Sequence, residues 1–219
     1  MTTNHEADLL QALPVVTDAE LAALHNRLAE RACADGVLDV AYRTLDTPVG
    51  TLLLAATDTG LVRVAYPIEG HDQVLQALAA RISPRILRAP GRLDAAAREI
   101  DEYFAGRRRT FDLPLDYRLS SGFRRIVLTH LPGIGYGRTA SYATVATAVG
   151  SPRAFRAVGT ACATNPLPVV LPCHRVVRSD GHAGSYRGGP AAKEFLLDLE
   201  VKRAGGAAPP GLRSEETAR

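Results

Sequence analysis

The chain has 219 residues, 46% of them hydrophobic and 22% charged, a composition typical of a globular protein that buries a sizeable core. No apolar run approaches the roughly 20 residues of a membrane span, and the N-terminus shows no signal peptide, so we expect a cytoplasmic protein. The three cysteines, Cys33, Cys162 and Cys173, lack the paired spacing of a disulfide framework or a zinc site.

The formal net charge of +3 is distributed unevenly along the chain. Residues 1–39 contain seven acids and two arginines, whereas residues 118–188 contain nine arginines and one acid, Asp180. A basic half suggests a polyanionic partner such as nucleic acid. A solvated arginine-rich surface would give the same count, because the whole chain has only two lysines. Charge alone leaves both interpretations open.

Residues 1–38 are expected to form an acidic, helical N-terminal extension. Leucines recur at helical spacing on both sides of Pro14, and Thr17 or Asp18 can cap the second of two helices. The leucines of the two predicted faces are Leu9, Leu10 and Leu13, then Leu21, Leu24 and Leu28. The segment is expected to pack on the core or on a partner and to be dispensable for chemistry.

Residues 39–117 are expected to form an α/β domain. Three strands at 40–45, 51–56 and 61–66, separated by turns with Gly50 and Gly60, predict a three-stranded antiparallel meander. The pattern then predicts helices at 71–81 and 93–104 and a short strand at 111–115.

Residues 118–203 are expected to form a mostly helical domain, followed by a disordered tail at 204–219. Two short helices at 142–149 and 152–163, joined by a turn with Gly150, fit a helix-turn-helix. Plain helix packing would explain the same pattern. Further helices are expected at 123–131 and 190–202. The glycine-rich loop at 131–137 lacks the spacing of a phosphate-binding P-loop.

The motif Pro172-Cys173-His174-Arg175-Val176 brings a thiol and an imidazole together between an apolar run and a short predicted strand at 175–178. A free thiol, with a pKa of about 8.5, needs help to react as a thiolate at neutral pH, and a neighbouring histidine can provide it. A buried cysteine beside a surface histidine is the non-functional alternative for the pair alone.

Several motifs together resemble the O6-alkylguanine-DNA alkyltransferases over residues 39–201. The motifs are Asn165-Pro166 with Pro172-Cys173-His174-Arg175-Val176, Tyr186 with Gly188-Gly189, Lys193-Glu194 with Leu196-Leu197 and Glu200, Ser141-Tyr142, Arg156-Ala157-Val158-Gly159, Thr47-Pro48-Val49-Gly50, and Glu102-Tyr103-Phe104-Ala105-Gly106. The resemblance implies a ribonuclease H-like α/β domain with a three-stranded antiparallel sheet. It also implies a C-terminal, winged helix-turn-helix-like domain that carries the active site.

The resemblance further implies DNA repair by direct reversal, in which the alkyl group on O6 of guanine moves irreversibly to Cys173. In this scheme His174 relays the thiol proton through a water, and Glu200 orients His174 and stabilises its charged form. Asn165 braces the turn around the thiol. The expected partner is double-stranded DNA containing O6-alkylguanine, bound by a monomer without a metal or another cofactor.

The family's binding residues carry over onto matching positions. Arg156 would fill the stack left by the extruded base, and Tyr142 would turn the 3′ phosphate and line the pocket. Small residues would let the second helix enter the minor groove. The predicted DNA contacts are Tyr142, Ser151, Ala154, Arg156, Ala157, Gly159 and Arg175. The predicted base pocket is Tyr142, Val176, Tyr186, Arg187 and Gly188.

Leu128 stands where many members have tryptophan, and Arg187 stands where some have a small residue, so the pocket size is open. The range of alkyl groups and activity on O4-alkylthymine are also open. A cysteine-dependent hydrolase would share the Cys-His-Glu set, but it would not need the basic helix-turn-helix. A non-catalytic binder of alkylated DNA would lack Cys173, and a second role as a transcription factor is a further alternative.

Overall fold

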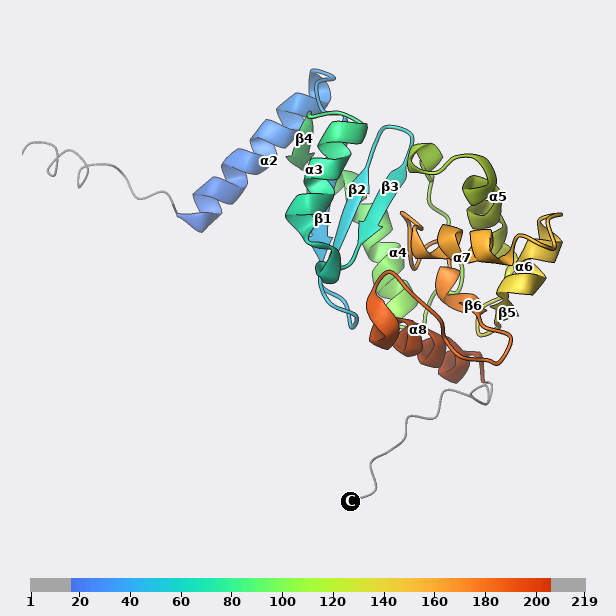
Figure 1. Cartoon of the computed structure of the whole chain (residues 1–219). Helices are drawn as coiled ribbons and strands as arrows, with labels where there is room; N and C mark the ends of the chain where they lie inside the picture. Colours follow the sequence, from blue (N-terminus) through green and yellow to red (C-terminus); the bar gives the residue numbers. More distant parts are fainter. Residues whose placement is uncertain (1–16, 206–219) are drawn as a thin grey trace, which may run out of the picture.

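The computed structural model describes residues 17–205 as two packed halves (Figure 1). The predicted helix around Leu9, Leu10 and Leu13 and most of the predicted tail lie outside these residues. The N-terminal half contains α2 (Asp18–Ala34), β1 (Val40–Leu45), β2 (Leu52–Ala56), β3 (Leu61–Ala65), η1 (Pro67–Glu69), α3 (His71–Arg81), β4 (Ile86–Arg88), η2 (Pro90–Leu93) and α4 (Asp94–Phe104). The C-terminal half contains η3 (Tyr117–Leu119), α5 (Gly122–His130), η4 (Leu131–Gly133), β5 (Ala140–Ser141), α6 (Tyr142–Ala148), α7 (Phe155–Ala163), η5 (Cys173–Arg175), β6 (Val176–Val177) and α8 (Gly189–Ala204).

The sheet has four strands in the order β3-β2-β1-β4. The three predicted antiparallel strands are confirmed, and β4 adds a fourth strand that runs parallel to β1 after the crossover through α3. With three residues, β4 is too short to show an alternating pattern. The strand predicted at 111–115 was wrong: only Leu115 forms a bridge, to Leu61, and Pro114 has no N–H to extend a ladder.

The sheet is buried on both faces. Val40, Leu53 and Val62 point to one face and pack with α3, while Leu52 and Leu54 point to the other. The second face shares one core with α4 and with the C-terminal half, where it reaches Leu128, Leu131 and Leu171. Because both faces are covered, β2 is a continuous apolar run. This shared core fixes the C-terminal half against the sheet.

The C-terminal half contains the predicted helix pair. The Ser141 hydroxyl accepts a hydrogen bond from the Thr144 N–H, 3.0 Å away, and so caps α6. Gly150, with φ of +74°, makes the turn. Helix α7 begins at Phe155 rather than at Pro152, because residues 151–154 form a turn that the Ala154 N–H closes by donating to the Ser151 carbonyl at 2.8 Å. Strand β5 pairs with β6 in parallel, which joins the start of this helix pair to the segment after Cys173.

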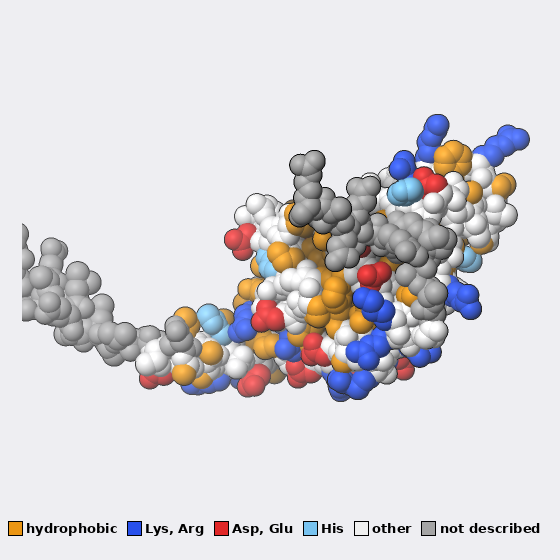
Figure 2. All heavy atoms as spheres, turned by 90° about the horizontal axis from the view of Figure 1, so that it is seen from below, with side chains coloured by type: hydrophobic (Ala, Val, Ile, Leu, Met, Phe, Trp, Pro, Cys, Tyr) orange, Lys and Arg blue, Asp and Glu red, His pale blue; other side chains and the backbone are white. Residues whose placement is uncertain are grey.

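Helix α2 extends from the body like an arm (Figure 1). Its N-terminus is the predicted Thr17 cap, completed by Glu20 as a capping box. The predicted leucine face does not pack on the core: Leu21, Leu24 and Leu28 are 46–53% exposed, and Ala29 and Ala32 make the buried contact instead. Figure 2 shows apolar side chains at the surface of this arm. Within residues 17–205, no helix is both long and apolar enough to cross a membrane.

Candidate active site

The turn that carries Cys173 is built from buried residues. The run 167–171 is fully buried and includes Val169 at φ of +71°, a conformation that is unfavourable for a β-branched residue. Pro172 follows with φ of −79° and ψ of 61°, and the Cys173 N–H donates to the Leu171 carbonyl at 2.7 Å. These values describe an inverse γ-turn. The predicted strand at 175–178 was too long, because η5 occupies Cys173–Arg175 and only Val176–Val177 are extended.

Asn165 lies inside this turn and is completely buried. Its side-chain amide donates to the Leu171 carbonyl at 2.9 Å and to the Cys173 sulfur at 3.1 Å, and its side-chain oxygen accepts from the Leu167 N–H at 2.9 Å. These three bonds tie both ends of the turn to one side chain. The predicted bracing position of Asn165 therefore has a direct structural basis.

His174 and Glu200 form a buried pair. His174 Nε2 lies 2.8 Å from Glu200 Oε1, and the two side chains are 0% and 1% exposed. Burial lowers the pKa of His174, which favours the neutral ring. With Nε2–H donating to the carboxylate, Nδ1 is the acceptor, and it has no hydrogen-bond partner in the described part of the protein. The ring is thus arranged to accept a proton at Nδ1.

Glu200 is held by more groups than the sequence predicted. Burial alone would raise the pKa of Glu200, but hydrogen bonds from His174 and Arg175 outweigh it and lower the pKa to about 2. The Tyr103 hydroxyl donates to Oε1 at 2.8 Å and the Gly137 N–H donates to Oε2 at 3.0 Å. The carboxylate is therefore ionised at neutral pH and fixed in orientation.

The Arg175 side chain, which was predicted to contact DNA, is buried in this structure. Its guanidinium lies inside the molecule, where it donates to both Glu200 oxygens at 2.9 Å and to the Ile134 carbonyl at 2.6 Å. An arginine can be a buried ion-pair partner as readily as a phosphate ligand, and here its partner is the buried carboxylate of Glu200, 25 positions away.

Tyr103 is the main site residue that sequence reasoning missed. It comes from α4 in the N-terminal half and is fully buried. Its position three residues after Ile100 on the buried face of α4 offered a signal, because a tyrosine hydroxyl on a buried stripe needs a polar partner. Lys193 is a second residue whose position sequence reasoning did not predict. It is fully buried, and its ammonium donates to the Val176 carbonyl at 2.7 Å.

The Cys173 thiol itself is buried, with the residue 1% exposed. Burial raises the pKa of Cys173 to about 11, even though the Asn165 hydrogen bond and the Lys193 charge favour the thiolate. The resting thiol is therefore protonated at neutral pH, and its reaction requires a base.

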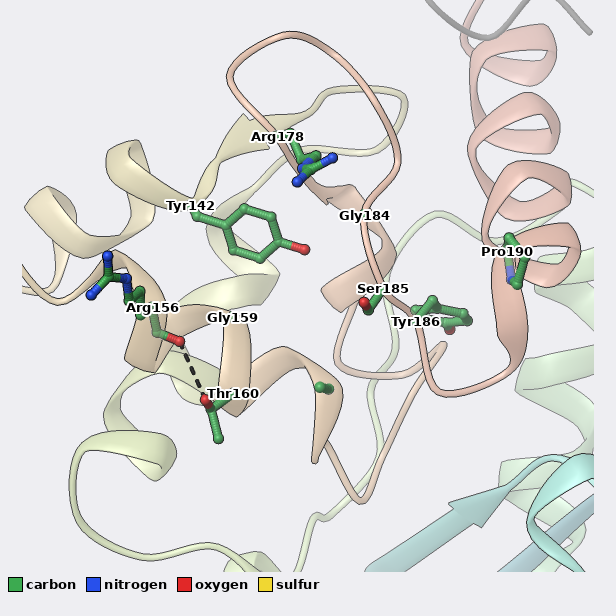
Figure 3. Close-up of a pocket in the computed structure, with 10 residues that line it drawn as sticks. Tyr142, Arg156, Gly159, Thr160, Arg178, Gly184, Ser185, Tyr186 and Pro190 are labelled. Atoms are coloured by element: carbon green, nitrogen blue, oxygen red, sulfur yellow. Dashed lines mark hydrogen bonds between the residues drawn. The ribbon is translucent and has the colours of Figure 1, made fainter.

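An open cleft of about 860 Å³ lies between α7 and the loop before α8 (Figure 3). Figure 3 shows Tyr142 between Arg156 of α7 and the loop with Gly184 and Ser185. The lining residues are Tyr142, Arg156, Gly159, Thr160, Ala163, Arg178, Gly184, Ser185, Tyr186 and Pro190. Tyr142, Arg156, Gly159 and Tyr186 were predicted site residues. Arg178, Thr160 and Ser185 were not.

The remaining predicted contacts lie around the cleft rather than along its wall. Ala157 is exposed on α7, Ser151 and Ala154 are half-buried in the turn before it, and Val176 is buried. Arg187 and Gly188 follow Tyr186 but face the N-terminal half. Gly184, with φ of +67°, permits the close approach of Tyr142, because a Cβ there would lie 2.8 Å from the Tyr142 hydroxyl.

Helix α7 presents one face to solvent. Val158, Ala161 and Cys162 are buried, whereas Arg156, Ala157 and Thr160 are exposed. The Arg156 guanidinium lies 5.7 Å from the Phe155 ring centroid, and Phe155 is itself 47% exposed. A basic side chain on an exposed helix with small neighbours suits close contact with a nucleic acid. Between residues 17 and 205, no group of three or more His, Cys, Asp or Glu side chains could hold a metal ion.

Comparisons with known proteins agree over both halves. Residues 40–117 match the family model of the 6-O-methylguanine DNA methyltransferase ribonuclease-like domain, and residues 122–202 match that of its DNA binding domain. Proteins named methylated-DNA--protein-cysteine methyltransferase are similar in Methanosarcina barkeri (36% identity, 73% of this chain, 96% of the relative) and Mycobacterium tuberculosis (37%, 74% and 93%).

The fold agrees as well. The crystal structure of Mycobacterium tuberculosis OGT in complex with DNA matches with a TM-score of 0.66 at 36% identity, covering 74% of this chain and 94% of that one. A second crystal structure, of the Mycobacterium tuberculosis O6-methylguanine methyltransferase, matches with a TM-score of 0.63. From these matches over both halves, the chain belongs to the 6-O-methylguanine DNA methyltransferase family.

Proposed function

We propose that this protein repairs alkylated DNA by direct reversal, moving the methyl group from O6 of guanine to the sulfur of Cys173. The observation that carries the proposal is a buried thiol next in sequence to a buried His174–Glu200 pair, in the same half of the chain as a cleft that the exposed Arg156 of α7 lines. The methylated-DNA--protein-cysteine methyltransferase names of the relatives support the same reaction.

The reaction begins with removal of the thiol proton. His174 Nδ1 takes it through a water, while Nε2–H stays bonded to Glu200, whose charge stabilises the imidazolium. The Cys173 sulfur then attacks the methyl carbon. The new S–C bond forms as the C–O6 bond breaks, and the electron pair goes to the guanine, which takes up the proton that the thiol released. The balance needs no cofactor.

The product is a thioether, which is a poor leaving group. Nothing in the proposed scheme regenerates the thiol, so each protein molecule acts once. The deep burial of Cys173 favours the same conclusion, because a methylated sulfur in this turn is shielded from solvent.

The target base has to leave the duplex, which costs a few kcal/mol. Arg156 fills the vacated position from α7, and Tyr142 turns the 3′ phosphate and lines the pocket. Ser151, Ala154, Ala157 and Gly159 allow α7 to approach the minor groove closely. Tyr186 and the Arg187 backbone contact the O6 region, and the carbonyls of Cys173 and Val176 accept from the guanine amine. Val176 already accepts from Lys193, and a carbonyl can accept a second bond.

The protein acts on O6-alkylguanine as a monomer in the cytoplasm. The observation behind the monomer is that one chain contributes the nucleophile, the histidine–glutamate pair and the cleft. Three free cysteines fit a reducing compartment.

The test is loss of the lesion from DNA. A duplex with one O6-methylguanine is incubated with excess protein, and the bases are quantified after digestion. O6-methylguanine should disappear with a matching gain of guanine, and Cys173→Ala should bind the duplex but leave the lesion intact. An unchanged lesion with the wild-type protein, or repair by Cys173→Ala, would overturn the proposal.

A further inference from the structure

Tyr66, which follows β3 in the N-terminal half, contacts Tyr186 in the loop before α8. The hydroxyl groups of Tyr66 and Tyr186 lie 3.0 Å apart, and the two rings meet edge to face with centroids 5.7 Å apart. Tyr66 is 1% exposed. Tyr186 also lines the cleft, so a residue of the N-terminal half supports the pocket wall directly.

Gly188 makes this contact possible. A Cβ at position 188 would lie 2.6 Å from two ring atoms of Tyr66, which is closer than packed atoms can approach. The loop backbone therefore lies directly on the Tyr66 ring. The spacing between the two halves is fixed at this point by a side chain with little freedom to move.

Glu69 fixes the same loop through charge. Its Oε2 accepts hydrogen bonds from Arg63 and from Arg187, and its Oε1 accepts from the Tyr66 N–H at 2.9 Å. The Arg187 side chain is directed to Glu69 and is not part of the cleft wall. Its length therefore does not narrow this cleft.

Arg63 extends the network to the nucleophile. Its guanidinium donates to the Pro166 carbonyl at 3.2 Å, and the same carbonyl accepts from the Val64 N–H at 2.9 Å. Pro166 follows Asn165, the residue that bonds the Cys173 sulfur. One chain of contacts therefore runs from the buried thiol turn through Arg63 and the partly buried Glu69 to Arg187, the residue after Tyr186.

We propose that Arg63 and Glu69 are positioning residues that set the separation between the Cys173 sulfur and the Tyr186 wall, and thereby favour small alkyl groups. This inference rests on the proposed function. A methyl group makes few contacts of its own, so its alignment with sulfur depends on the wall. A benzyl group occupies more space and retains contacts when the wall moves.

The test compares two lesions in one duplex sequence. Rate constants for O6-methylguanine and O6-benzylguanine are measured for wild type and Glu69→Gln. Each rate constant is calculated for the fraction of protein that has reacted when the reaction is complete, so that unfolded molecules do not contribute. Misplacement of about 1 Å can cost roughly 100-fold in rate, so a partial loosening should slow methyl transfer about tenfold. Benzyl transfer should fall less, and the benzyl-to-methyl ratio should rise.

The matched control is Glu99→Gln. Glu99 also lies in the N-terminal half and accepts a hydrogen bond from a backbone N–H, that of Asp112, but it is buried and pairs with Arg108 rather than with Arg187. Its replacement should lower the melting temperature without changing the ratio. If Glu69→Gln fails to fold, Arg187→Gln serves instead, because it leaves Glu69 paired with Arg63.

The double variant Glu69→Gln/Arg187→Gln completes a double-mutant cycle. Its benzyl-to-methyl ratio should be no higher than that of Glu69→Gln alone, because both changes break the same contact between Glu69 and Arg187. An unchanged ratio in Glu69→Gln or Arg187→Gln, with the wild type active, would overturn the positioning role and leave the proposed function standing. A wild type that transfers neither group would contradict the proposed function itself.

Discussion

The reactivity that we propose for Cys173 depends on the protonation states of the thiol and of the His174–Glu200 pair. Burial raises the pKa of the thiol to about 11, so the resting sulfur stays protonated at neutral pH. The Glu200 carboxylate, with its pKa lowered to about 2, stays ionised and can stabilise a charged His174. The pair therefore supplies the base that burial of the thiol makes necessary.

Removing this base should slow transfer in a pH-dependent way. His174→Gln should slow the reaction at pH 7 by about 100-fold or more, the usual contribution of a general base. The loss should shrink as the pH approaches 11, because hydroxide then ionises the thiol without help. Transfer rates between pH 6 and 10.5 measure this, and a loss that is equal at both ends would contradict the base role.

Glu200→Gln provides a companion measurement at the same scale. It should also slow transfer at neutral pH, and it leaves the buried Arg175 without its carboxylate, so it should lower the melting temperature more than His174→Gln does. Since the pKa of Glu200 is lowered in the folded state, its contribution to stability is present above pH 4.5 and fades as the pH falls toward 2. Unfolding measured between pH 2 and 6 should show a weaker pH dependence in the variant than in wild type.

At the scale of elements, the DNA recognition that we propose for α7 is separate from the chemistry that we propose for Cys173. Arg156 is exposed on α7 and lines the cleft, while the thiol lies on a separate turn. Arg156→Ala should therefore slow repair of duplex DNA by at least tenfold, consistent with a few kcal/mol for extrusion, and should barely change reaction with free O6-methylguanine. Arg153→Ala, an exposed arginine before α7, is the control and should act mainly through salt-dependent affinity. If Arg156→Ala lowers the rate equally on duplex DNA and on free O6-methylguanine, the proposed role of Arg156 in base extrusion is contradicted.

Helix α2 offers a second test at this scale. Its N-terminal part is exposed, whereas Ala29, Ala32 and Leu38 are buried against the body. Removal of residues 1–28 should leave both the melting temperature and the repair rate nearly unchanged. Removal through residue 38 should lower the melting temperature but not the rate of the folded protein. A folded but inactive truncated protein would show that this arm takes part in repair.

Regular elements were largely predictable because their signals are local. The helices 71–81 and 142–149 agree with α3 and α6 to within a residue. Strand β4 was missed because it exists only through its pairing with β1. The roles of Tyr103 and Arg175 were missed for the same reason: their partner, Glu200, is 97 and 25 positions away.

At the scale of the whole molecule, the site is assembled across two halves that share one core. The C-terminal half supplies the thiol, the histidine and the cleft, while the N-terminal half supplies Tyr103, Tyr66 and the Arg63–Glu69 link. The domain boundary at residues 117–118 remains a prediction from the sequence. What matters for function is that neither half holds the complete site.

The central claim is that Cys173 is a stoichiometric acceptor, and the most direct measurement is a titration followed by peptide mapping. Increasing duplex with one O6-methylguanine is added to a fixed amount of protein, and the methylated peptide is identified by mass. Repair should stop when one lesion has been removed per protein molecule, with the methyl group on Cys173 and none on Cys33 or Cys162. Continued turnover, or methyl on Cys162 in place of Cys173, would contradict the mechanism.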